Sequence, residues 1–295
     1  VILPDDIYGE SSFEKAERKM LLESLSLCLK KYNYRPEDFD LILAGDLLNQ
    51  LISANFAVRD LNIPFAGVFG ACSTFNLSIG LGSLLVEAGY VDRVIAGACS
   101  HHQTAERTFR FPTELGVQRK ATATWTMSGA GSVILSRQGL VKVKEITFGR
   151  VVDYGLKDTN NLGAVMAPAA FDTLKRHLQN LGKKPEDYDL IATGDLGSVG
   201  QIMLKHLLGD ASLDAGNLTD CGLLVYASTQ DKHAGASGCA ASACVFSSYF
   251  YPLLCQGQLK NVLLLATGAL FAQITAQQKD SIPAVAHAIA FEKVE

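Results

Sequence analysis

A twelve-residue segment occurs twice in this chain, and the two copies lie about half a chain length apart. The segment PEDFDLILAGDL begins at Pro36 and the segment PEDYDLIATGDL begins at Pro185, an offset of 149 positions. Nine of the twelve positions are identical, which is far more than unrelated segments share by chance. The repeat predicts two copies of one structural unit, each about half of the chain, rather than a solenoid of short repeats.

Hydrophobic periodicity predicts a similar order of elements on both sides of the chain. Helices are expected over residues 11–31, 51–62, 77–88, 167–181, 199–208 and 238–256. Strands are expected over residues 41–44, 63–69, 93–98, 132–136, 141–148, 190–193, 223–226, 262–266 and 284–291. Strands that alternate with helices predict an α/β fold with mostly parallel sheets and helices on both faces.

The repeat divides the chain into an N-terminal half, residues 1–140, and a C-terminal half, residues 141–295. A strand over residues 141–148 opens the second half. The offset of 149 places the counterpart of this strand before Val1. We therefore expect the first half to lack its first strand.

The composition bounds the classes of function. Apolar residues make up 48% of the chain and charged residues 19%, with a net charge of −4, so a large core and a further apolar interface in an oligomer are expected. This charge balance argues against nucleic acid as a partner. Seven cysteines without metal-ligand spacing predict free thiols. The longest uncharged run, residues 234–259, is interrupted by glycine, serine and proline, so no transmembrane segment is expected.

Cys72 lies where a buried strand is predicted to pass into a buried helix, in the sequence FGACSTFN. At a helix N-terminus, free N–H groups and the helix dipole favour a thiolate over a thiol. A nucleophile at such a junction is one way in which α/β folds expose a reactive atom above a sheet. The alternative is a small apolar side chain that packs at the start of a helix.

Three motifs, together with the duplication, give this chain a resemblance to the thiolase superfamily of thiolases and ketoacyl synthases. They are the Cys72 junction, the segment HAGASG that begins at His233, and the Gly-rich segment LLLATGA that begins at Leu263. The resemblance implies two duplicated α/β halves stacked in five layers, αβαβα. It also implies a homodimer formed through the strand before the cysteine, here the strand that begins at Ile63 and ends at Phe69.

The chain departs from the superfamily in the groups that would turn over a thioester. One residue separates His233 from the following glycine, where thiolases have two. The position that normally supplies a His or Asn to the thioester oxygen is occupied by Asp195, and an ionised carboxylate opposes a developing oxyanion. Thr267 lies near the place of the second thiolase cysteine. On this resemblance, the chain retains the superfamily's cysteine as Cys72 and lacks the residue that would bind the thioester oxygen.

A closer resemblance comes from the polar loop that begins SHHQTAERTFRFPTELG at Ser100. It is similar to the stage V sporulation AD family, thiolase-like proteins of spore-forming Gram-positive bacteria. That resemblance implies binding of dipicolinic acid, with Ca²⁺, and its uptake into the developing spore. It also implies a location in the forespore, peripheral to the inner membrane, beside other stage V sporulation proteins that are embedded in the membrane.

The expected ligand-binding residues are Cys72, Asp195, His233 and Ser237, with Arg107 and Arg110 from the loop. Asp195 is either a pocket carboxylate that can help to hold Ca²⁺ or a helix N-cap. His233 is either a pocket base or a surface-turn histidine. The loop arginines, interleaved with aromatic residues, suit a planar aromatic dicarboxylate, because guanidinium groups pair with carboxylates and rings stack. Otherwise the loop is solvated.

Two other functions remain open at this level. In an active acyl-transferring enzyme, Cys72 would form a thioester and His233 would act in condensation or decarboxylation. In a dimeric scaffold, the protein would dock a membrane partner and the pocket would be vestigial. An acyl adduct on Cys72 would identify the enzyme, whereas a pocket that tolerates substitution would identify the scaffold.

Overall fold

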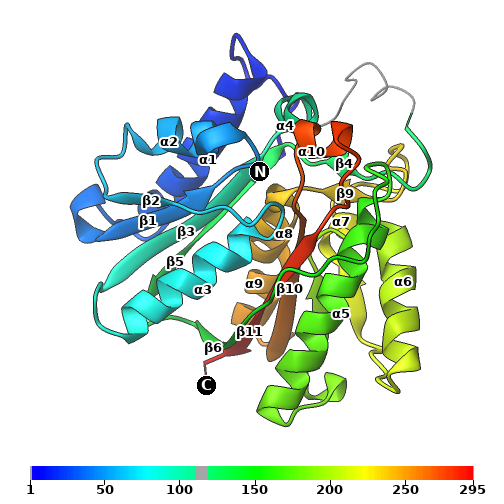
Figure 1. The fold of residues 1–295 in the computed structure, drawn as a ribbon. Coiled ribbons are helices and arrows are strands. Elements are labelled where there is room, and N and C mark those ends of the chain that lie inside the picture. The colour runs from blue at the N-terminus through cyan, green and yellow to red at the C-terminus, as the bar shows by residue number, and fades with distance from the viewer. Residues whose placement is uncertain (1, 110–118, 295) are drawn as a thin grey trace.

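A computed structural model describes residues 2–109 and 119–294 of the chain. Two β-sheets lie side by side with helices between and around them (Figure 1). The first sheet has the strand order β2-β1-β3-β5. Its strands are β1 (Leu41–Gly45), β2 (Phe65–Gly67), β3 (Arg93–Ser100) and β5 (Gly129–Ser136).

The second sheet has the strand order β6-β11-β10-β7-β8. Its strands are β6 (Val141–Phe148), β7 (Leu190–Thr193), β8 (Leu218–Asp220), β10 (Asn261–Ala269) and β11 (Ala284–Lys293). A separate two-stranded ribbon pairs β4 (Trp125–Thr126) with β9 (Ala236–Ser237) in parallel. This ribbon holds the segment around Ser237 against the first half of the chain.

The two sheets repeat one pattern of neighbours. Strand β1 lies between parallel strands β2 and β3, and β7 lies between parallel strands β8 and β10. Antiparallel strands β5 and β11 occupy matching places. In each repeated segment an aspartate, Asp40 or Asp189, accepts hydrogen bonds from the two backbone N–H groups that begin the neighbouring strand. The identity of the repeat therefore reflects the same local geometry in both sheets.

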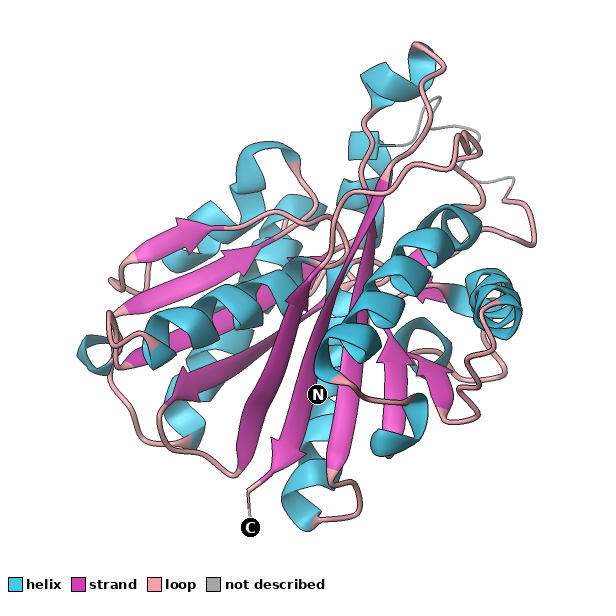
Figure 2. Cartoon of the chain, turned by 60° about the horizontal axis from the view of Figure 1, so that its bottom comes forward, coloured by secondary structure: helices cyan, strands magenta, loops and turns pink. Residues whose placement is uncertain are grey.

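The helices form three layers, which gives the order αβαβα (Figure 2). Helices α1 and α2 cover the outer face of the first sheet, α3 and α8 lie between the sheets, and α5 and α6 cover the outer face of the second sheet. The helices of these three layers are α1 (Phe13–Lys31), α2 (Ile52–Val58), α3 (Thr74–Glu87), α5 (Leu162–Leu181), α6 (Gly197–Asp210) and α8 (Cys239–Val245). The other helices are α4 (His102–Phe109), α7 (Cys221–Leu224), α9 (Tyr251–Gln256) and α10 (Gln273–Gln277). The predicted fold class is confirmed.

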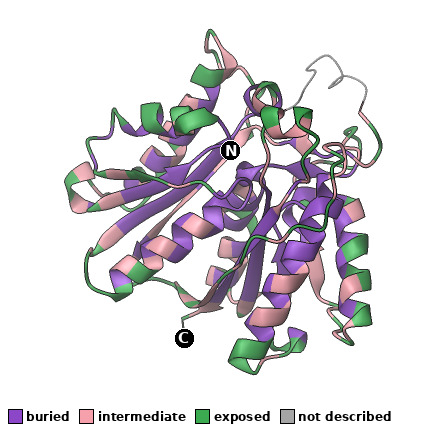
Figure 3. Ribbon diagram, viewed as in Figure 1, coloured by how far each residue is buried: buried purple, intermediate pink, exposed green. Residues whose placement is uncertain are grey.

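The central helix α3 ties the two halves together. Phe75 and Ile79 are fully buried and pack in one core cluster with residues of both sheets. The amide of Asn76 donates hydrogen bonds of 2.8 Å to the backbone oxygens of Leu264 and His287 in the second sheet. Strands β1, β3, β7, β10 and β11 are largely buried, whereas the outer helices expose one face (Figure 3). Cys72, at the start of α3, is thus held between two rigid sheets.

Several predicted elements differ from the observed ones. The strand expected over residues 63–69 is reduced to β2 at the edge of its sheet, and Phe69 is 54% exposed rather than buried. Residues 223–226 do not form a strand, because the chain pairs earlier, in β8, and then turns through α7. The helix expected over residues 238–256 is divided by a π-helical turn, Phe246–Phe250, just before Pro252. A proline removes one backbone donor, which accounts for this irregularity.

Two expectations from composition can also be compared with the structure. All seven cysteines are free thiols, as the sequence predicted. Within the described residues, no helix combines the length and the apolar character needed to cross a membrane.

Candidate functional site

The junction between β2 and α3 presents Cys72 in a strained turn. Ala71, the residue before the cysteine, has a left-handed backbone with φ +49°, which non-glycine residues rarely adopt. The turn closes through hydrogen bonds from the backbone nitrogens of Ser73 and Thr74 to the oxygens of Gly70 and Ala71. A Cβ at Gly268 would lie 2.4 Å from the Gly70 oxygen, so only glycine lets β10 approach this turn.

Asp195, which follows strand β7, lies directly beside Cys72 and is 1% exposed. Its Oδ1 accepts a hydrogen bond of 2.7 Å from the Thr267 hydroxyl, and its Oδ2 accepts one of 3.1 Å from the Gly238 N–H. The side chains of Cys72 and Ser237 also lie beside this carboxyl group, close enough to lower its pKa. Polar groups from three different segments therefore converge on one buried carboxyl group.

The surroundings of Cys72 stabilise its thiol rather than its thiolate. Burial raises the pKa of the Cys72 thiol well above its ordinary value, and the negative charge of Asp195 raises it further. The position at the head of α3 therefore does not produce the thiolate that the sequence suggested. Burial also raises the pKa of Asp195, and the hydrogen bonds from Thr267, Cys72 and Gly238 oppose that rise.

The structure excludes a capping role for Asp195. The backbone nitrogens of Leu196 and Gly197, which begin α6, donate to Asp220 instead, at 2.8 and 3.1 Å. The equivalent residue in the first half, Asp46, does cap a helix, because it accepts hydrogen bonds of 2.7 Å from the N–H groups of Leu48 and Ala54. The two copies of the repeat thus assign different roles to the same aspartate.

A pocket of about 90 Å³ opens above Cys72 and Ser237. Its wall is mostly apolar and comes from both halves of the chain. The lining residues are Leu47, Leu48, Asn49, Phe69, Ala71, Cys72, Thr108, Phe109, Leu162, Ser237, Ala269, Phe271 and Ala272. The rings of Phe109 and Phe271 meet edge to face over this pocket, with centroids 5.4 Å apart. The volume lies well below the roughly 300 Å³ of typical small-molecule pockets, so a ligand of ordinary size fits only if the wall moves.

His233 does not line this pocket. Its Nδ1 lies 2.9 Å from the backbone oxygen of Lys120, and its ring meets Trp125 edge to face. The reason is the pairing of β4 with β9, which holds Ser237 at the pocket and places His233, four residues earlier, beside Lys120 and Trp125. The surface-turn alternative for His233 fits this geometry better than the pocket base.

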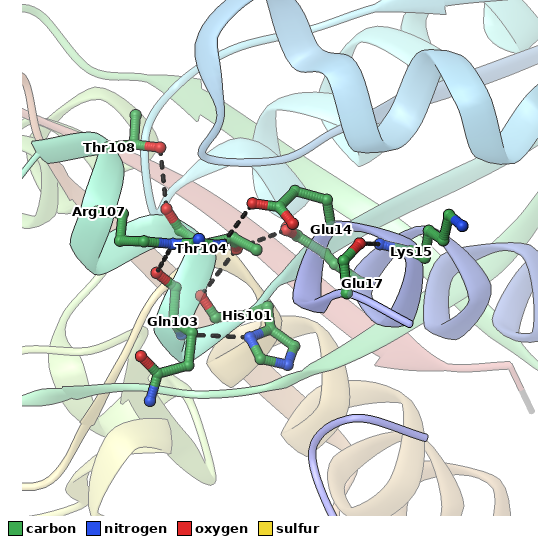
Figure 4. A network of polar contacts seen from close by, with 9 residues as sticks. Glu14, Lys15, Glu17, His101, Gln103, Thr104, Arg107 and Thr108 are labelled. Atoms are coloured by element: carbon green, nitrogen blue, oxygen red, sulfur yellow. Dashed lines mark hydrogen bonds and ion pairs between the residues drawn. The ribbon is translucent and has the colours of Figure 1, made fainter. Parts of the chain in front are cut away.

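Arg107 also points away from the pocket. Its guanidinium pairs with Glu14 on α1 and donates to the backbone oxygen of Gln103 (Figure 4). Both partners of the ion pair are about half exposed, at 49% and 46%, so the pair contributes at most about 1 kcal/mol. Arg110 lies outside the described residues. The structure thus brings together Cys72, Asp195 and Ser237 from the predicted set, and it separates them from His233 and Arg107.

The sequence did not point to Asn49, Phe109 or Phe271, although all three line the pocket. The signal available in the sequence was the position of Asn49, three residues after Asp46, the capping aspartate of the first copy of the repeat. The two phenylalanines come from segments more than 150 residues apart and meet only in the folded chain. In the described part of the chain, no three His, Cys, Asp or Glu side chains are grouped as metal ligands.

Comparison with solved structures shows the same fold at low sequence identity. The chain superimposes on 3-oxoacyl-[acyl-carrier-protein] synthase III from Aquifex aeolicus with a TM-score of 0.57, 16% identity, and coverage of 94% of this chain and 84% of that one. For Acat5 thiolase from Ascaris suum, in complex with coenzyme A, the TM-score is 0.62, the identity 11%, and the coverage 97% and 96%. At such identities the likeness establishes the fold alone.

Sequence comparison is more specific. A curated relative, stage V sporulation protein AD of Bacillus subtilis, is 44% identical over 287 residues, which cover 97% of this chain and 85% of the relative. The family profile described as Stage V sporulation protein AD (SpoVAD) matches residues 1–292. The resemblance inferred from the motifs is therefore confirmed, and this chain belongs to the stage V sporulation protein AD family.

Proposed function

We propose that this sporulation protein is a non-catalytic thiolase-fold protein that binds dipicolinic acid in the pocket above Cys72 and supports its uptake into the developing spore. The observation that carries the proposal is the position of the buried Cys72 thiol directly beside the buried carboxyl group of Asp195. A nucleophilic cysteine acts as a thiolate, and here burial and a neighbouring negative charge disfavour that form. The chain therefore keeps the pocket above Cys72, while the thiol of Cys72 stays uncharged.

Acyl transfer, the alternative function, lacks two requirements in this geometry. It needs donors aimed at the oxygen that becomes negative, and Asp195 places a carboxylate beside the sulfur instead. It also needs a general acid or base, and His233 lies at the outer end of the β4–β9 ribbon. Binding without turnover needs neither group.

The shape and chemistry of the pocket suit a flat aromatic ligand. Phe109 and Phe271 both line it and contact each other, and offset or edge-to-face ring contacts contribute about 0.5–1.5 kcal/mol beyond burial. Helix α10, which follows Phe271, has no buried residue. Because the closed volume is only about 90 Å³, we propose that α10 moves outward when the pyridine ring enters.

Calcium has a defined place in this proposal. The lining residues in the described part of the chain include no charged side chain, and burial of an uncompensated dianion is strongly unfavourable. Each oxygen of Asp195 already accepts a hydrogen bond, from Thr267 or from Gly238, so this residue is poorly arranged as a calcium ligand. We therefore propose that Ca²⁺ enters as a complex with dipicolinate and offsets the ligand's own charge.

We also propose a homodimer formed through strand β2. This strand has one neighbour within its sheet, and Phe69 beside it is 54% exposed, as is expected of a surface that a second copy covers. Helix α2 contributes further exposed apolar side chains, Ile52 and Phe56. The proposed location is peripheral to the spore inner membrane, where the dimer would dock membrane-embedded stage V sporulation proteins.

The direct test is calorimetric titration of the protein with dipicolinate, with and without Ca²⁺. We expect saturable binding that is tighter with Ca²⁺. Ala272→Trp should abolish binding, because Ala272 lines the pocket and is exposed, so a large side chain can fill the entrance without disturbing the core. Ile274→Trp is the matched control, since Ile274 lies on the same helix, is 63% exposed and does not line the pocket.

The same protein should form no adduct on Cys72 when it is incubated with acyl-CoA and analysed by mass spectrometry. A stable acyl-Cys72 species would support the enzyme. The absence of saturable dipicolinate binding under both conditions would refute the proposed function.

A further inference from the structure

The polar side chains of the pocket differ in whether their donors are already used. Four such side chains line the pocket: Asn49, Cys72, Thr108 and Ser237. The Thr108 hydroxyl donates to the backbone oxygen of Thr104 at 2.9 Å. The side chains of Cys72 and Ser237 lie beside the carboxyl group of Asp195, which can accept from both. Each of these three side chains carries a single polar hydrogen and has an acceptor within the protein.

Asn49 is the exception. Its carboxamide carries two N–H donors, and within the described residues neither donates to another protein group, so both face solvent at the pocket. The residue is exposed at the mouth of the pocket. Asn49 therefore offers the side-chain donors that an acidic ligand in this pocket can use without breaking an existing hydrogen bond.

The backbone that carries Asn49 is held in an unusual conformation. The next two residues, Gln50 and Leu51, have left-handed backbones with φ +56° and +54°. Such conformations cost roughly 1–3 kcal/mol for each non-glycine residue and tend to gather at binding sites. Strain of this kind persists only where neighbouring groups enforce it.

Two side chains enforce this turn. Asp46 accepts hydrogen bonds from the backbone nitrogens of Leu48 and Ala54, on either side of the turn. The amide of Asn55 donates to the backbone oxygens of Gln50 and Leu51, both at 2.9 Å. The position of Asn49 is thus fixed from both ends, although the side chain itself makes no contact that requires it.

We propose that Asn49 is the residue that recognises a carboxylate of the bound ligand, by donating from its carboxamide. This inference rests on the proposed function and adds the specific group that binds the carboxylate of the ligand. The carboxylate would lie at the mouth of the pocket, and the ring would lie inward between Phe109 and Phe271. A neutral donor suits a ligand whose charge is already offset by its own Ca²⁺.

Calorimetry with dipicolinate and Ca²⁺ tests this assignment in four proteins: wild type, Asn49→Leu, Asn49→Ala and Gln50→Asn. Both Asn49 variants should weaken the Kd by about 10- to 100-fold, the usual loss for one hydrogen bond to a charged group. Gln50→Asn should bind like the wild type, because asparagine tolerates the left-handed backbone and Gln50 does not line the pocket. Thermal melting of each variant controls for folding.

The outcomes separate this inference from the function on which it rests. If the wild type does not bind, the proposed function fails. If the wild type binds and both Asn49 variants bind equally well, the assignment of Asn49 is overturned while the function stands. Weakening by Asn49→Leu alone would indicate steric filling of the pocket and would also overturn the assignment.

Discussion

Replacement of Thr267 by valine tests whether Asp195 is a buried carboxylate held by donors. The substitution keeps the shape of the side chain and removes the hydroxyl that donates to Asp195 Oδ1 at 2.7 Å. Both residues are buried, at 0% and 1% exposure, so water can neither replace the lost donor nor screen the charge. A hydrogen bond to a charged group contributes about 1.5–3 kcal/mol, and we expect Thr267→Val to lower the free energy of unfolding by about 2 kcal/mol at pH values where Asp195 is ionised.

The loss should depend on pH in a defined direction. Burial raises the pKa of Asp195 above its value in the unfolded chain, and the Thr267 hydroxyl opposes this rise. Without the hydroxyl, the folded protein holds its proton to a higher pH, so the variant loses more stability than the wild type as pH increases. The difference between the two proteins should shrink as pH falls toward and below the raised pKa of Asp195.

Urea unfolding at several pH values between 5 and 8 measures this difference. Thr108→Val is the matched control, because the Thr108 hydroxyl donates to a backbone oxygen, which does not titrate. Its effect should be smaller, about 1 kcal/mol, and independent of pH. An effect of Thr267→Val that does not grow as pH rises through the raised pKa of Asp195, or that is absent above it, would refute the ionised, donor-held carboxylate.

Three further predictions concern the pocket. Asp195→Asn should speed the alkylation of Cys72 by iodoacetamide, measured by peptide mass spectrometry, because loss of the negative charge lowers the pKa of the thiol; an unchanged rate would contradict the role of Asp195. Phe271→Ala should also speed this alkylation, by opening the pocket, whereas Ile274→Ala should not; equal rates in both variants would argue against closure by the ring. His233→Ala should leave dipicolinate affinity within about twofold in calorimetry, and a tenfold loss would return His233 to the site.

The sequence predicted the architecture because the residues that recur in the two halves have defined structural roles. Asp40 and Asp189 each bind the N–H groups that begin the next strand, and this requirement preserved the repeat. The Cys72 junction was equally visible, since its turn depends on a short local motif. Local geometry and periodicity were therefore enough to predict the fold class and the position of the Cys72 sulfur.

The site was harder to predict because its chemistry depends on contacts between distant segments. Asp195 has the same sequence context as Asp46, and only the folded chain shows that one binds Cys72 while the other caps a helix. His233 keeps much of a known motif, yet the β4–β9 ribbon carries it away from the sulfur. The position of Asn49 depends on a strained turn that no periodicity in the sequence indicates.

The most direct test of the binding account is a crystal structure of the protein with dipicolinate and Ca²⁺. The account predicts the pyridine ring between Phe109 and Phe271, a carboxylate within hydrogen-bond distance of the Asn49 carboxamide, and an unmodified Cys72 that still donates to Asp195. Ligand density outside this pocket, or a covalent group on the Cys72 sulfur, would contradict it.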